Sequence, residues 1–93
     1  MRQATQEKMT RIDFRLAANG NKKAAVAGTF NNWKPASMAL LADKEGPTYH
    51  KAVMLHKGTH EYKFLVDGQW LVDPNNQEWT RNDLGTLNSV IHF

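Results

Sequence analysis

Two of the three tryptophans in this chain stand at expected turns, beside amide side chains. Trp33 closes the run Phe30-Asn31-Asn32-Trp33, and Trp70 follows Asp67-Gly68-Gln69. An indole offers a flat apolar face and one N–H donor at low entropic cost, and neighbouring polar side chains add further donors and acceptors. A ligand that is apolar on its faces and hydroxylated at its edges, such as a sugar, would suit this combination. These residues therefore favour a binding function over a catalytic one.

Each candidate residue also has a purely structural interpretation. Trp33 could equally fill the core of a β-sandwich, whereas Trp70, directly after a hairpin turn, favours the surface. Trp79 lies in a polar stretch, which it could either pack against the domain or present to a ligand. Lys63 alternates with apolar neighbours, so it points away from the core, where a solvated lysine would also stand.

Known catalytic motifs are absent from the sequence. It contains no glycine-rich phosphate loop, no His-Glu-x-x-His and no Gly-x-Ser-x-Gly. Asp67, Asp73 and Asp83 are the loop carboxylates that could form a glycosidase-like pair, but Asp67 and Asp73 each precede a turn-forming residue, which explains them structurally. The histidines, at spacings that do not favour a metal, are His50, His56, His60 and His92. We therefore expect no enzyme activity, no metal site and no cofactor.

Composition indicates one small globular domain. The chain has 93 residues, of which 41% are hydrophobic and 23% charged, and it has no cysteine. Its net charge of +3 is scattered along the chain rather than gathered in a stripe, which argues against a nucleic-acid partner. No apolar run approaches the roughly 20 residues that span a bilayer, and the N-terminus lacks the apolar region of a signal peptide. A cytoplasmic protein without a membrane partner is the expectation.

Alternation of apolar and polar residues predicts short strands. The clearest runs from His60 to Val66, and another from Arg11 to Leu16. Further strands are expected at about Lys23–Gly28, near Ala39–Ala42, at Tyr49–Leu55, at Gln69–Val72 and at about Leu87–Phe93. About seven short strands without a helical segment predict an all-β fold, an immunoglobulin-like antiparallel β-sandwich. A small barrel such as an OB-fold is the alternative.

Turn-forming residues separate these strands. Asn19-Gly20 predicts a hairpin between the first two strands, and Asp67-Gly68 predicts another, because both pairs tolerate positive φ. Residues 31–47 form a long connection that Met38, Leu40 and Leu41 are expected to pin to the core. Residues 73–86 are expected to form a loop.

Four short motifs follow one another at suitable intervals. They are Val26-Ala27-Gly28-Thr29-Phe30-Asn31-Asn32-Trp33, Tyr62-Lys63-Phe64-Leu65-Val66-Asp67-Gly68-Gln69-Trp70, Asp73-Pro74 and Leu84-Gly85-Thr86-Leu87-Asn88. In this order they resemble family 48 carbohydrate-binding modules, and within that family the glycogen-binding domains of AMP-activated protein kinase β subunits. The resemblance covers roughly residues 10–93, which would be the sandwich domain after a flexible lead-in at residues 1–9.

The resemblance implies an immunoglobulin-like sandwich that binds α-1,4-linked glucans such as glycogen, starch and malto-oligosaccharides. The matching positions would be the tryptophan platform Trp33 and Trp70, the lysine Lys63 that hydrogen-bonds glucose hydroxyls, the projecting Leu84, and the hydrogen-bonding Thr86 and Asn88. The loop before Leu84 is slightly longer than the family pattern and carries Trp79, which could add a contact or reshape the site.

A second hypothesis belongs to another functional class. An immunoglobulin-like docking module, as a regulatory subunit or a packing domain of a glycogen or starch enzyme, would use its exposed tryptophans as anchors for a protein partner. Excess malto-oligosaccharide separates the two hypotheses, because it releases a glucan module from its matrix but leaves a docked protein in place.

Overall fold

The computed structural model describes residues 9–17, 23–35, 39–42 and 48–93. Its elements are, in chain order, β1 (Met9–Ala17), β2 (Ala24–Gly28), the 3-10 turn η1 (Thr29–Asn31), β3 (Leu41–Ala42), β4 (Thr48–His56), β5 (Thr59–Val66), β6 (Gln69–Leu71), β7 (Trp79–Arg81) and β8 (Leu87–His92). In this described part of the chain no helix is long and apolar enough to cross a membrane.

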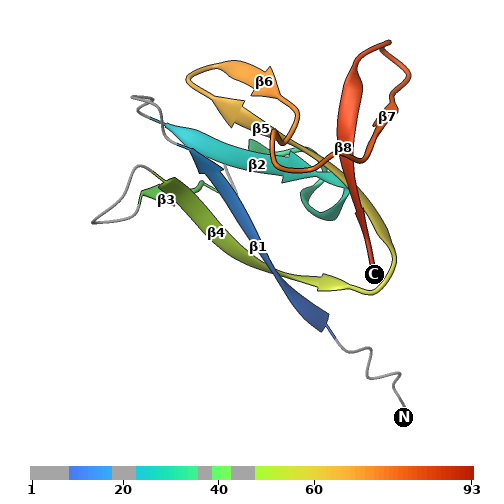
Figure 1. The fold of residues 1–93 in the computed structure, drawn as a ribbon, viewed down its shortest axis with the longest axis horizontal. Coiled ribbons are helices and arrows are strands. Elements are labelled where there is room, and N and C mark those ends of the chain that lie inside the picture. Colours follow the sequence, from blue (N-terminus) through green and yellow to red (C-terminus); the bar gives the residue numbers. More distant parts are fainter. Residues whose placement is uncertain (1–8, 18–22, 36–38, 43–47) are drawn as a thin grey trace.

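The strands form two antiparallel sheets that pack face to face (Figure 1). The three-stranded sheet has the order β1-β4-β3, and the five-stranded sheet has the order β2-β5-β8-β7, with β6 paired to β5. One edge of β5 pairs with β2, while its other edge pairs first with β8 and then with β6. The predicted all-β sandwich is confirmed, and the two separate sheets are not closed into the alternative barrel.

The core lies between the inner faces of the two sheets. Phe14 on β1 packs edge-on against Tyr62 on β5, with ring centroids 4.9 Å apart, and against Phe64 at 6.4 Å. Burying each such ring stabilises the fold by roughly 1.5–3 kcal/mol. The buried cluster comprises Phe14, Leu16, Ala24, Val26, Leu40, Tyr49, Val53, Leu55, Tyr62, Phe64 and Val66. Alternation along β1, β4 and β5 supplies most of these side chains, as the sequence predicts.

Every strand expected from the sequence is present, with its ends shifted by at most a residue or two. The Asp67-Gly68 hairpin is confirmed, because both residues have positive φ, at 47° and 86°. Leu40 is buried and its amide donates to the Ala24 carbonyl (2.8 Å), so it pins the long connection beside β2 as expected. Met38 lies outside the described residues, and the side chain of Leu41 is also outside them.

Two expectations about connections are wrong. The first two strands do not pair as a hairpin: β1 pairs along its whole length with β4, and β2 lies in the other sheet. Asn19-Gly20 itself is outside the described residues. Residues 73–86 are not entirely loop, because they contain the strand β7, which pairs with β8. A strand of three residues is too short to show alternation.

The backbones of β2 and β5 approach closely at Gly28. A Cβ atom there would collide with the carbonyl oxygen of Glu61 and with the ring of Phe30. The turn that follows is held by Asn31, whose Oδ1 accepts from the Gly28 amide (2.9 Å) and whose Nδ2 donates to the carbonyls of Val26 and Lys34 (3.2 Å each). Gly28 and Asn31 together fix how the chain leaves β2.

A buried polar cluster ties the end of β6 to the core. The Tyr62 hydroxyl donates to Asp73 Oδ2 (2.6 Å), and the Asp73 amide donates to Ser89 Oγ (2.7 Å). Asp73 Oδ1 also accepts from the Asn75 amide at 2.8 Å. Burial, and then the hydrogen bond to Asp73, raise the pKa of the Tyr62 phenol above its ordinary value. The phenol therefore stays protonated in the folded state.

Gly28→Ala should destabilise the domain by about 1–3 kcal/mol, because the added methyl group meets backbone that cannot rotate away. Chemical denaturation measures the change. Gly68→Ala is the matched control, since its Cβ would meet open space and only its positive φ is unfavourable. A Gly28→Ala cost no larger than that of Gly68→Ala would contradict the close approach.

Tyr62→Phe should lower the free energy of unfolding by about 1–3 kcal/mol at neutral pH, because it leaves the buried Asp73 carboxylate short of a donor. Since the folded pKa of Tyr62 is raised, the unfolded chain loses that proton first, at about pH 10. The stability difference between wild type and Tyr62→Phe should therefore narrow as pH rises above 10. A constant difference up to pH 11, measured by urea denaturation, would contradict this interpretation.

Candidate functional site

A groove of about 930 Å³ lies on the outer face of the five-stranded sheet. Its floor includes Glu61 and Lys63, which alternate along β5 with the buried Tyr62 and Phe64 and so face away from the core. Thirteen residues line it: Thr29, Trp33, Glu61, Lys63, Trp70, Val72, Arg81, Asn82, Asp83, Leu84, Thr86, Leu87 and Asn88. Strands β5, β6 and β8 and the turns after β2 and β7 therefore meet at one surface.

All six binding residues expected from the sequence line this groove. Trp33 comes from the turn after η1, Lys63 from β5, Trp70 from β6, Leu84 and Thr86 from the β7–β8 turn, and Asn88 from β8. They span more than 50 residues of sequence, so only the fold brings them together. Their contact with a sugar stays a prediction.

The two groove tryptophans are reachable from solvent. Trp33 is half-buried and belongs to no core cluster, whereas Trp70 is 47% exposed and stands opposite Leu65 in the β5–β6 ladder. Trp33 has a left-handed backbone (φ 60°), as has the preceding Asn32 (φ 55°), and its amide donates to the Gly28 carbonyl at 3.0 Å. Two successive non-glycine residues adopt a left-handed backbone only where the surrounding structure holds them there. The hydrogen bonds of the Asn31 side chain hold this turn.

Hydrogen bonds join the polar residues of the groove into one network. Lys63 Nζ donates to Thr86 Oγ1 at 2.9 Å. At the other end of the network, Asn88 Nδ2 donates to Glu61 Oε1 at 2.9 Å. Asn88 is itself 5% exposed, so it lies at the floor. The network fixes the ammonium and the carboxylate before a ligand arrives, which reduces the entropic cost of binding.

Asn82 occupies the centre of this network. Its Nδ2 donates to Thr86 Oγ1 (2.7 Å) and to Asn88 Oδ1 (2.9 Å), and its Oδ1 accepts from the amides of Leu84 (3.0 Å) and Thr86 (3.1 Å). Leu84, at the tip of this turn, is 88% exposed. The Asn82 side chain thus holds the turn that presents Leu84 to solvent.

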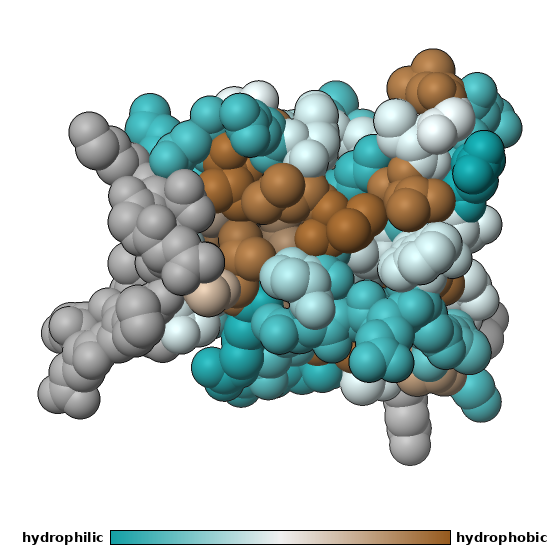
Figure 2. All heavy atoms as spheres, turned by 45° about the horizontal axis from the view of Figure 1, so that its top comes forward, coloured by the Kyte–Doolittle hydropathy of each residue, from teal (hydrophilic) through white to brown (hydrophobic). Residues whose placement is uncertain are grey.

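The charges in the groove balance. Glu61 and Asp83 are carboxylates, and Lys63 and Arg81 are cations. A groove of low net charge suits a neutral polar ligand better than a polyphosphate, which requires an excess of positive charge. On the face that comes forward when the top of Figure 1 is tilted toward the viewer, Figure 2 shows hydrophobic residues gathered in the middle, with hydrophilic residues above and below them.

Trp79 does not line the groove. It lies on β7 opposite Ser89, next to Thr80, which stands opposite the groove residue Asn88. By alternation Trp79 shares a face of β7 with Arg81, which itself lines the groove, but Trp79 stands at the end of β7 away from the β7–β8 turn. Trp79 lines a separate depression with Gln77, Glu78 and Val90.

Sequence reasoning missed Glu61 and Asn82. Glu61 shares the outer face of β5 with Lys63, and that alternation could have identified it. Asn82 carried no signal, because its role depends on the geometry of the β7–β8 turn. Among the described residues, no group of three or more histidine, aspartate or glutamate side chains is arranged to hold a metal ion.

Comparison with known proteins gives one family. The family model described as the glycogen recognition site of AMP-activated protein kinase matches residues 10–93. The chain is 39% identical over 75 residues to 5'-AMP-activated protein kinase subunit beta-2 of Mus musculus, covering 81% of this chain and 26% of that protein. It is 39% identical over 72 residues to subunit beta-1 of Sus scrofa, covering 77% of this chain and 55% of that sequence. The chain thus spans about a quarter of the length of the first relative and about half of the length of the second.

Solved structures share the fold. A maltogenic amylase from S. marinus superposes with a TM-score of 0.74 at 17% identity, over 89% of this chain and 13% of that one. An enterochelin esterase from Shigella flexneri superposes with a TM-score of 0.74 at 13% identity, over 97% of this chain and 32% of that one. At these identities the likeness concerns the sandwich alone.

Asn82→Ala should release the β7–β8 turn, because it removes both acceptor bonds to the amides of Leu84 and Thr86. We expect hydrogen exchange at these two amides to accelerate by about tenfold or more, the equivalent of about 1.4 kcal/mol. Exchange measured by NMR at each residue tests this. Asp83→Ala, in the same turn, is the control and should leave both amides protected; equal acceleration in the two variants would contradict the role of Asn82.

Proposed function

We propose that this chain, which belongs to the family described as the glycogen recognition site of AMP-activated protein kinase, is a non-catalytic module that binds α-1,4-linked glucan in the groove. The observation that carries the proposal is the convergence of Trp33, Trp70 and Lys63 on one open surface of balanced charge. Glycogen, starch and malto-oligosaccharides are the ligands it would take.

The tryptophans would supply most of the binding free energy. The C–H faces of a glucose ring can lie on an indole, where weak C–H contacts add to burial of apolar area at roughly 25 cal/mol per Å². Leu84, which is 88% exposed, would gain further burial when a sugar packs against it. Because the groove is open, each glucose unit keeps much of its hydration, and affinity for one short chain should be modest.

The polar network would orient the sugar. Lys63 has further N–H donors beyond the one that binds Thr86, and the Thr86 hydroxyl, which accepts two hydrogen bonds, can donate its own proton. Asn88 Nδ2 donates one of its two hydrogens to Glu61, so the second hydrogen could bind a ligand. Glu61 adds a carboxylate acceptor that the family pattern did not indicate. Donors and acceptors that alternate along the groove suit vicinal hydroxyls.

Of the three loop carboxylates considered as a glycosidase-like pair, Asp83 lines the groove, whereas Asp67 and Asp73 do not. Asp73 is buried and accepts hydrogen bonds from Tyr62 and from the Asn75 amide. Asp67 Oδ1 accepts from the Lys23 amide at 2.9 Å, which joins the β5–β6 hairpin to the start of β2. Both groups have structural roles away from the groove, so neither is placed to act on a ligand there.

Native electrophoresis through gels that contain glycogen tests the proposal. The wild type should be retarded, and Trp70→Ala or Trp33→Ala should reduce retardation by about tenfold or more in apparent affinity, since each removes an aromatic face. Met54→Ala is the matched control, because Met54 is 51% exposed on the other sheet. Circular dichroism must show that each variant is folded.

Two outcomes would contradict the proposal. A folded wild type that glycogen does not retard would exclude glucan binding and favour the docking module. Equal losses in Met54→Ala and Trp70→Ala would mean that the groove is not the binding surface.

A further inference from the structure

The third tryptophan stands on a surface of its own. Trp79 is 55% exposed, more than Trp70, and it is not among the residues that line the groove. Beside it is a depression of about 400 Å³ whose other lining residues are Gln77, Glu78 and Val90. A wider groove of about 560 Å³ shares those three residues and extends to Asn76 and His92.

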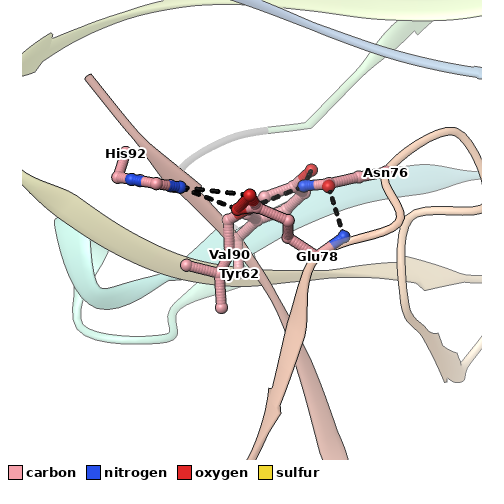
Figure 3. Close-up of polar contacts among 5 residues, drawn as sticks. All are labelled: Tyr62, Asn76, Glu78, Val90 and His92. Atoms are coloured by element: carbon pink, nitrogen blue, oxygen red, sulfur yellow. Dashed lines mark hydrogen bonds and ion pairs between the residues drawn. The ribbon is translucent and has the colours of Figure 1, made fainter.

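The depression beside this indole is lined by two polar side chains, Gln77 and Glu78, and by one apolar side chain, Val90. Glu78 Oε2 lies 2.7 Å from His92 Nε2 (Figure 3). Both side chains are more than half exposed. Gln77 adds an amide with two donors and one acceptor. The other large apolar side chains that the described residues expose, Met9, Met54, Trp70, Leu71, Leu84 and Phe93, line neither depression. An aromatic ring beside one amide, one carboxylate and a single valine differs from a protein-docking patch, in which anchors cluster with several apolar neighbours.

The chain that leads into Trp79 is held in place. Asn76 Nδ2 donates to the Tyr62 hydroxyl (3.1 Å) and to the Val90 carbonyl (2.8 Å), while Asn76 Oδ1 accepts from the Glu78 amide (2.8 Å), as Figure 3 shows. The Val90 amide in turn donates to the Glu78 carbonyl at 3.0 Å. Trp79 is therefore presented by an ordered turn, and little backbone entropy would be lost if a ligand packed on it.

We propose that Trp79, with Gln77 and Glu78, forms a second glucan-binding surface, independent of the groove. Its ligand is the same class of α-linked glucose chain, because a flat ring flanked by hydrogen-bonding side chains matches a sugar face and its hydroxyls. The proposal thus rests on the proposed function for the identity of the ligand. The two surfaces share no lining residue, so each can engage its own chain or its own branch.

Two binding surfaces on one domain should strengthen its retention on a branched glucan. A branched polymer presents many chain ends, so binding at one surface raises the effective concentration of glucan at the other. A short oligosaccharide gains nothing from the second surface. Trp79→Ala should therefore weaken retention on glycogen by several-fold and leave the affinity of the groove for maltoheptaose unchanged.

NMR of the three indole N–H groups, titrated with maltoheptaose, tests the proposal directly. In the wild type all three signals should shift. In the double variant Lys63→Ala/Trp70→Ala, in which the groove is disabled, the Trp79 signal should still shift and saturate. Addition of Gln77→Ala to that double variant should weaken the Trp79 response, whereas addition of the control Met54→Ala should not.

The three signals separate failure of this inference from failure of the proposed function. Shifts at Trp33 and Trp70 with an unmoved Trp79 would overturn the second surface and leave the groove intact. A Trp79 shift that disappears in the double variant would also overturn it, because the response would then depend on the groove. No shift at any indole would overturn both proposals.

Discussion

The hydrogen bond from the Tyr62 hydroxyl to Asp73 is the interaction on which both candidate surfaces depend. The Tyr62 ring packs on Phe14 inside the sandwich, so the bond joins the core to the segment that follows β6. The Asp73 amide donates to Ser89 Oγ on β8, and Asn76 Nδ2, from the turn that leads to Trp79, donates to the Tyr62 hydroxyl. One buried phenol thus sets the positions of β6, β8 and the turn between them.

The groove follows from the same strand. Alternation along β5 directs Tyr62 and Phe64 inward, and the same alternation directs Glu61 and Lys63 outward. A shift of register by one residue would therefore lose the core and the polar floor together. Asn82 and Asn88 then connect the two charged groups, so the floor behaves as one unit rather than as separate surface side chains.

Local patterns predict every strand except β7 and also the Asp67-Gly68 hairpin, because alternation and turn chemistry are short-range signals. The six groove residues were predicted only through the resemblance of four ordered motifs to a family. Pairing was not predictable in the same way. Asn19-Gly20 suggested that β1 and β2 are neighbours, but β1 pairs with β4, and Phe14 of β1 packs across the sandwich on Tyr62 and Phe64. Glu61, Asn82 and the separation of Trp79 from the groove depend on register and turn geometry, which no local pattern contains.

None of the three tryptophans belongs to the buried core, where the aromatic residues are Phe14, Tyr49, Tyr62 and Phe64. The intrinsic fluorescence of this domain therefore originates at its surface, and emission should respond to whatever covers the indoles more than to loosening of the interior. The near-ultraviolet circular dichroism of Tyr62 gives the complementary signal from inside. Two optical signals of one unlabelled chain thus separate occupancy of the surface from integrity of the fold.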